Sequence, residues 1–343
     1  AASGGNDIGG GISGGKAVAQ CTRKGKSFIF ERFFRRLISA SYTPTDAAQA
    51  ATFGEKTMAR MVWTEKRIER MLAEGRGQGS GADYKPWIEV AEVSSGGRSR
   101  RVWSSKTGRT HHLLSDVEYD LFLVCEWAKN VVDIREQYPL PRDLTQTIAQ
   151  ELRIRHPTYP GTNIPAVMTV DFLLTLQVNG KKTVMALNAK RDEEADDVRS
   201  LEKLEIQRST FERLGFTHHL VYHSQIPEQK VKNIDWIRGA LVKPGEPEQH
   251  DGFFKGLADR MSGELATPAD TTLASTLEDY CTDFDSRYGV LAGTGLRVAR
   301  ILMAERVLVP DLASPNITRQ SLAAFIMTGQ PGRLRVVGGT SAL

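Results

Sequence analysis

Asp171, Asn188 and Lys190 lie in a segment that we expect to fold as a β-hairpin, which would bring their side chains together. A second carboxylate, Glu118, lies upstream. Asn179-Gly180 separates two runs of alternating apolar residues, and an Asn-Gly pair in this setting is the strongest short-range signal for a two-residue hairpin turn. That turn places Asp171 opposite Asn188, with Lys190 diagonally from Asp171 on the same face. We expect the reverse face to be core, because its residues are Val170, Phe172, Leu174 and Leu187.

These residue types suit the hydrolysis of a phosphodiester. The reaction needs Mg²⁺ held by hard oxygen ligands, a positioned water and a cation that offsets the charge of the phosphate. Asp171 would supply a bridging carboxylate, and the backbone carbonyl of Ala189 and the side chain of Asn188 are further candidate ligands. Glu118 would complete the metal shell, while Lys190 would orient or activate water and offset charge on the phosphate. Mn²⁺ is expected to substitute for Mg²⁺ at such oxygen ligands.

An alternative is a structural ion pair between Asp171 and Lys190 on an exposed sheet face, since an Asp and a Lys at this separation occur in many sequences. Two neighbouring features favour the chemical interpretation. Ser115-Asp116-Val117-Glu118 is a capping box, which places Glu118 in the first turn of a helix that continues to about Trp127. A basic segment comes directly before this helix.

The basic segment lies between Ser94 and Ser115 and contains no acidic residue. We expect a loop that lies along DNA phosphates, and a solvated basic loop is the alternative. The candidate DNA contacts are Arg98, Arg100, Arg101, Lys106, Arg109 and His112. The adjacent pairs His111-His112 and His218-His219 are poor metal ligands, because neighbouring side chains point apart.

The elements that must position these residues alternate between helix and strand. A first helix is expected after Thr64, which is a good N-cap. Beyond the helix of Glu118, the pattern predicts strands near 131–134, 167–178, 182–190 and 216–223, with a helix at 197–214. This order indicates an α/β fold with a mixed sheet flanked by helices.

The chain changes character after Pro227, and residues 243–247 are typical of a linker. Helical patterns follow near 253–265, 270–287 and 293–304, then a short strand at 307–309 and a helix after Thr318. We therefore expect a catalytic domain at 56–243 and a small, mainly helical domain at 244–343, after a flexible leader and basic-aromatic extension at 1–55. Within that extension, residues 23–38 fit a helix packed on the protein or an arm that contacts DNA or a partner.

Composition excludes several classes of protein. Of 343 residues, 40% are hydrophobic and 25% are charged, with a net charge of +4, which is typical of a globular protein. No apolar run approaches the ~18 residues that span a bilayer. Three distant cysteines without a CxxC pair argue against a Cys-based zinc site and a disulfide scaffold, and they fit a reducing cytosol. The glycines near residues 9–16 lack the upstream strand of a nucleotide-binding motif.

Several strings resemble the TnsA family, the endonuclease subunit of heteromeric cut-and-paste DNA transposases. They are collinear over about residues 60–240 and comprise EGRGQG (74–79), YKPW (84–87), GRS (97–99), KTGR (106–109), HHLLSD (111–116), VDIREQ (132–137), MTVDFL (168–173) and LEKLE (201–205). The resemblance implies a restriction-endonuclease-like domain whose metal-dependent catalytic residues fall on Glu118, Asp171 and Lys190. Asn188 stands where the family has a longer Gln, and Gln207 stands where it has a Glu.

By the same resemblance, the protein would be a Mg²⁺-dependent endonuclease that cleaves double-stranded DNA at the 5′ ends of a transposon. A TnsB-like DDE transposase would process the 3′ ends, and a winged-helix-like C-terminal domain would contact DNA and a TnsC-like AAA+ regulator. Two other functions stay open: a catalytically silent DNA-binding scaffold subunit, and a free-standing restriction or repair nuclease.

Overall fold

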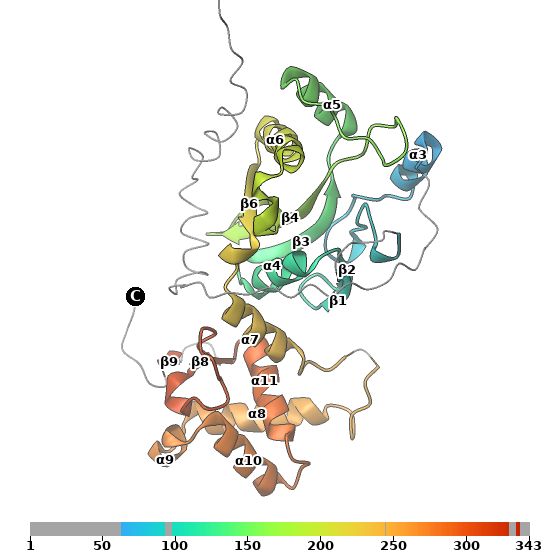
Figure 1. The fold of residues 1–343 in the computed structure, drawn as a ribbon. Helices are drawn as coiled ribbons and strands as arrows, with labels where there is room; N and C mark the ends of the chain where they lie inside the picture. Colours follow the sequence, from blue (N-terminus) through green and yellow to red (C-terminus); the bar gives the residue numbers. More distant parts are fainter. Residues whose placement is uncertain (1–62, 93–97, 244, 329–333, 337–343) are drawn as a thin grey trace, which may run out of the picture. The chain divides into compact units, whose positions relative to one another are not determined.

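The fold is that of a computed structural model, which describes residues 63–92, 98–243, 245–328 and 334–336 (Figure 1). The expected leader and basic-aromatic extension, residues 1–55, lies outside this part of the chain. None of the helices described here is both long enough and apolar enough to cross a membrane.

A four-stranded mixed sheet positions the residues of interest. Its strands, in spatial order, are β3 (Val131–Pro139), β4 (Thr169–Val178), β5 (Lys181–Lys190) and β6 (Thr217–Tyr222). The first three are antiparallel, and β6 runs parallel to β5. The β4–β5 hairpin turns at Asn179 and Gly180, whose φ angles of 50° and 77° are the positive pair that a type I′ turn needs. The register predicted from this turn is confirmed, since Phe172 pairs with Leu187.

Helices flank the sheet, as the sequence predicts. They are α4 (Asp116–Trp127), α5 (Arg142–Glu151) and α6 (Val198–Arg213). The α4 helix packs against β3 and β5, whereas α5 and α6 pack against each other and lie across the sheet from α4 (Figure 1). A buried cluster joins Ile148, Ile206 and Phe211 of α5 and α6 to Val170 and Ala186 of the sheet. The α/β fold with a mixed sheet is therefore confirmed.

The chain before α4 contains a helix and a hairpin. Thr64 caps α3 (Glu65–Ala73), because its side chain accepts a hydrogen bond from Arg67 N–H. The prediction of a loop between residues 94 and 115 is wrong, because β1 (Arg100–Ser104) and β2 (Arg109–Leu113) pair there as antiparallel strands. Side chains of β2 are alternately buried and more exposed, which is the two-residue period of a strand. The residue types do not show this period, because most residues of β2 are polar.

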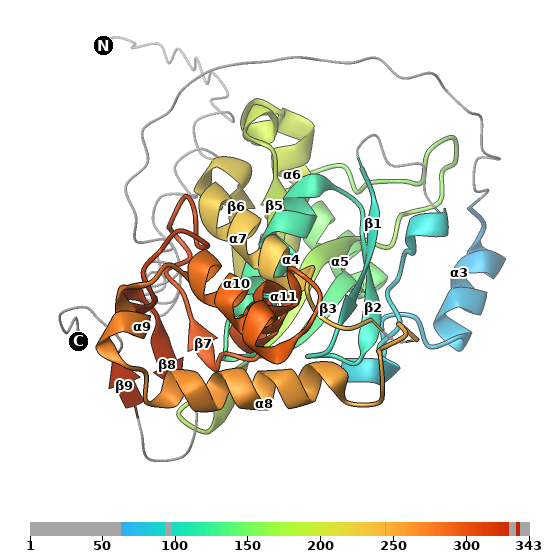
Figure 2. The same ribbon diagram turned by 90° about the horizontal axis from the view of Figure 1, so that it is seen from below.

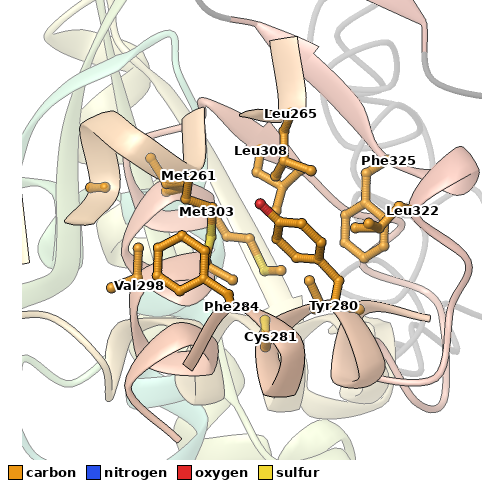
Figure 3. Packing of buried hydrophobic residues seen from close by; sticks show 14 of the residues in the cluster. Met261, Leu265, Tyr280, Cys281, Phe284, Val298, Met303, Leu308, Leu322 and Phe325 are labelled. Carbon is orange, nitrogen blue, oxygen red and sulfur yellow. The ribbon is translucent and has the colours of Figure 1, made fainter. Parts of the chain in front are cut away.

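Downstream of β6 the chain is mainly helical. The elements are α7 (Glu228–Arg238), α8 (Phe253–Ala266), α9 (Asp270–Ala274), α10 (Leu277–Tyr288), α11 (Thr294–Ala304) and an antiparallel sheet of β7 (Leu308–Val309), β8 (Ile326–Thr328) and β9 (Leu334–Val336). The α11 helix packs against α8 and α10 (Figure 2). Phe284, Met303 and Phe325 lie in the buried core of this region (Figure 3).

Two details of this region differ from the prediction. The helix expected at 270–287 is divided, because Thr276 leaves helical geometry and caps α10 by accepting from Asp279 N–H. Where a helix was expected after Thr318, Ser321 caps a short 3-10 turn and the chain then enters β8. The boundary at residues 243/244 stays a prediction, and Ile237, upstream of it, belongs to the same buried core as Phe284.

Candidate active site

Glu118 is held at the start of α4 by a reciprocal cap. The Ser115 hydroxyl accepts from Glu118 N–H at 3.1 Å and donates to Glu118 Oε1 at 3.2 Å. Leu114 N–H donates to Glu118 Oε2 at 2.9 Å, so the carboxylate folds back over the helix N-terminus. Ser115 is the N-cap that the sequence predicts, but the Glu118 carboxylate accepts from Leu114 N–H and not from the Ser115 N–H of a capping box. These contacts fix a glutamate that is only 7% exposed.

Asp171 lies at the level where β4 and β5 separate. The last paired residues of this ladder are Phe172 and Leu187. Beyond them, Ala189 N–H donates to Asp171 Oδ2 at 2.7 Å. The register therefore sets Asp171 opposite Asn188, and the Asn188 side chain lowers the pKa of Asp171 against the effect of burial.

Lys190 is the last residue of β5, and its ammonium belongs to the same group of charges. Its Nζ lies 3.1 Å from Glu194 Oε2. Burial alone would lower the pKa of Lys190, but the charges of Asp171, Glu194 and Glu118 raise it above its ordinary value. Lys190 therefore stays protonated at neutral pH, as a cation among three acidic side chains.

The two carboxyl groups destabilise each other's ionised form. Burial raises the pKa of Glu118, and the negative charge of Asp171 raises it further. Burial also raises the pKa of Asp171, although Lys190 and the Ala189 N–H oppose this effect. Two partly desolvated carboxylates that repel each other are a donor set that a divalent cation would stabilise. The pair thus fits the predicted cation site.

The wider donor set is small. Within the described ranges, no group of three or more His, Cys, Asp or Glu side chains is arranged to hold a metal ion. Asn188 does not offer a free oxygen, since His218 Nε2 lies 2.7 Å from Asn188 Oδ1. Burial lowers the pKa of His218 to about 4, so this ring is neutral. The remaining ligands would be backbone carbonyl, water and substrate oxygens.

The basic residues divide into two groups. Arg98 and Arg101 are exposed, and Arg100 pairs with Asp116 at 2.9 Å beside the first turn of α4. His112 is half-buried, and its Nδ1 accepts from Val90 N–H at 3.1 Å. These four residues lie on or next to the hairpin, where DNA could reach them.

The other two basic residues, Arg109 and Lys106, have internal partners, and their predicted phosphate contacts stay a prediction. Arg109 is 7% exposed and donates to Glu136 and to the Ile134 carbonyl. Lys106 donates to the Ala128 carbonyl at 2.6 Å, and burial lowers its pKa to about 8. Both side chains hold the hairpin to β3 and α4.

Gln137 is a residue of this site that sequence reasoning missed. Its Nε2 donates to Glu118 Oε2 at 3.4 Å, and its Oε1 accepts from Thr169 Oγ1 at 3.1 Å. Glu136 pairs with Phe172 and Tyr138 pairs with Val170, so Gln137 lies opposite Asp171. Its place in the VDIREQ string is the sequence signal that points to it. Glu205, in the LEKLE string on α6, pairs with Arg208 at 2.7 Å.

Comparisons with known proteins show which family the chain resembles. Residues 128–223 match the family model "TnsA-like endonuclease N terminal", and residues 225–312 match "TnsA endonuclease C terminal". The first match contains Asp171 and Lys190 and begins after Glu118. The transposon Tn7 transposition protein TnsA of Escherichia coli is 41% identical over 179 residues, which are 52% of this chain and 64% of that protein. The chain therefore matches less than two thirds of the length of this relative.

Proposed function

The chain belongs to the TnsA family of transposon endonucleases, and from this premise we propose that it cleaves DNA as a subunit of a transposase. The observation that carries the proposal is the convergence of Glu118, Asp171 and Lys190 at the end of the β4–β5 hairpin. The specific reaction would be hydrolysis at the 5′ ends of a transposon. The setting would be the bacterial cytoplasm, on nucleoid DNA.

The side chains have distinct tasks in this proposal. Glu118, Asp171 and the Ala189 carbonyl would hold Mg²⁺, or Mn²⁺ in its place. A bound cation of this kind polarises the phosphate and lowers the pKa of a coordinated water. Asp171 is anchored by Ala189 N–H, so its second oxygen has a fixed direction. Asn188 would act as a support for Asp171 rather than as a ligand.

Lys190 supplies the fixed positive charge. Its raised pKa keeps the ammonium protonated, so it can donate hydrogen bonds to the phosphate or orient the attacking water. Its contact with Glu194 restricts the direction of the side chain. A protonated lysine in this place stabilises negative charge and does not act as the base.

The exposed basic residues would position the duplex. Arg98 and Arg101 can approach phosphates directly, and Arg100 and His112 lie beside them. Phosphate contacts fix position without reading sequence. The partners in the proposal are double-stranded transposon ends, a TnsB-like DDE transposase for the 3′ ends and a TnsC-like AAA+ regulator.

Strand-resolved cleavage of a transposon-end duplex, with the full chain and its partner subunits, tests the function. The unaltered protein should release the 5′ ends in Mg²⁺. Asp171→Ala should reduce cleavage by about 100-fold or more, whereas Asp143→Ala, an exposed position on α5, should not. Unchanged cleavage by Asp171→Ala would refute the site.

The second variant separates catalysis from binding. Lys190→Ala should lose cleavage while keeping DNA affinity, and Lys181→Ala, exposed at the other end of β5, should keep both. DNA binding without cleavage by the unaltered protein would favour the scaffold subunit. Cleavage of plain DNA without partners would favour a free-standing nuclease.

A further inference from the structure

Gln137 is a buried strand residue with a backbone conformation that residues with a side chain rarely adopt. It is 4% exposed and has a φ of 46°. The other described non-glycine residues with positive φ are Arg153, Asn179 and Arg306. They lie just beyond α5, in the hairpin turn and just beyond α11, where the left-handed conformation is ordinary. Gln137 is the member of this set that lies inside a strand.

Such a conformation persists only where the surroundings over-determine it, and it often marks a functional site. The surroundings here are Glu136 and the segment around Trp87. The Glu136 carboxylate accepts from Arg109, from His111 and from the backbone N–H of His112. The Glu136 carbonyl accepts from the Tyr84 hydroxyl at 3.0 Å. The Gln137 carbonyl accepts from Trp87 N–H at 3.2 Å. The strand is therefore fixed at Glu136 and at the strained residue itself.

The side chain of Gln137 connects the two elements that carry the carboxylates. Its amide nitrogen donates to Glu118 on α4, and its amide oxygen accepts from Thr169 on β4. Thr169 is itself held, since its carbonyl accepts from Gln207 Nε2 at 2.7 Å. An uncharged donor orients Glu118 without adding a third negative charge beside Asp171.

We propose that Gln137 is a positioning residue that aligns Glu118 with Asp171 for cation binding, and that its left-handed backbone is retained for this purpose. The proposal rests on the function proposed above. Gln137 supports a ligand from behind and does not contact the reacting atoms. Removal of such a support commonly reduces metal affinity by about 10- to 100-fold.

The test uses a substitution that keeps the backbone and removes the amide. Glycine adopts positive φ without strain, so Gln137→Gly should fold. Gln137→Met keeps the length of the side chain and cannot donate to Glu118. Asn179→Gly is the matched control, because it makes the same backbone change at φ 50° in the exposed hairpin turn.

Mn²⁺ binding to the full chain without DNA, followed by electron paramagnetic resonance, is the primary readout. Both Gln137 variants should bind Mn²⁺ about 10-fold more weakly, and the control should bind as the unaltered protein does. Cleavage should recover at saturating Mn²⁺. Melting temperature in the absence of metal reports on folding separately.

Unchanged Mn²⁺ affinity in both Gln137 variants would overturn the proposal, even if their melting temperatures fell, because the role would then be structural alone. Failure of the proposed function has a different signature. It would appear as an unaltered protein that binds no Mn²⁺, or as Mn²⁺ binding that survives Asp171→Ala.

Discussion

Substitution of Glu136 by Gln should destabilise the fold strongly, because Glu136 is a fully buried anion with several donors. It is 0% exposed and accepts from Arg109, His111 and the His112 backbone N–H. Burial opposes ionisation, but the hydrogen bonds of Arg109 and His111 prevail and lower its pKa from 4.5 to about 2. At ~1.4 kcal/mol for each pKa unit, ionised Glu136 contributes about 3 kcal/mol to folding.

The sign of the pH dependence follows from this lowered pKa. The contribution is fully present above pH 4.5, the ordinary pKa, and is lost as the pH falls towards 2. Glu136→Gln removes it at every pH and leaves Arg109 buried without its counter-charge, which costs about 3–5 kcal/mol in comparable cases. For a chain region of this size, the melting temperature should fall by roughly 6–20 °C at neutral pH.

Thermal unfolding between pH 3 and 8 is the assay. Glu151→Gln is the matched control, since Glu151 pairs with Arg213 on the exposed surface, and it should change the melting temperature little. The double variant Arg109→Met with Glu136→Leu should be more stable than either single change, because it leaves no unpaired charge. A fall no larger than the control's, or an unchanged acid limb, would refute this reasoning.

Three further predictions concern the cap, the charges and the DNA surface. Ser115→Ala should cost about 1 kcal/mol in stability and raise the Mn²⁺ concentration needed for cleavage, and an unchanged Mn²⁺ requirement would contradict the role of this cap in fixing Glu118. Because burial raises the pKa of Glu118 and of Asp171, cation binding should strengthen with rising pH and should release protons. Calorimetry in two buffers of different ionisation enthalpy measures the number of protons released. Zero proton release at pH 6 would be inconsistent with the site. Arg101→Ala should weaken DNA binding and reduce the salt slope by about one, whereas Lys106→Met should leave that slope unchanged, and equal slopes for the two variants would remove Arg101 from the surface.

The hairpin register could be predicted from the sequence because one local feature determines it. The Asn179-Gly180 turn requires two positive φ angles, and a two-residue turn permits one pairing of the strands. The position of Glu118 could also be predicted, because the capping-box pattern consists of four consecutive residues. Both inferences use short-range geometry.

The roles of Arg109 and Gln137 could not be predicted, because each depends on a distant partner. A basic residue in a segment without acids is equally suited to phosphate or to a buried carboxylate, and Glu136 lies on another strand. Gln137 contacts Glu118 from a strand position whose backbone is left-handed. Nothing in a glutamine codes for that conformation, which the surrounding hydrogen bonds impose.

The central claim is that Glu118 and Asp171 hold the cation that cleaves DNA. Anomalous diffraction from crystals of the full chain with Mn²⁺ and a transposon-end duplex tests this most directly. We predict an anomalous peak in contact with both carboxylates, near the Ala189 carbonyl and a DNA phosphate. A peak that contacts neither carboxylate would contradict it.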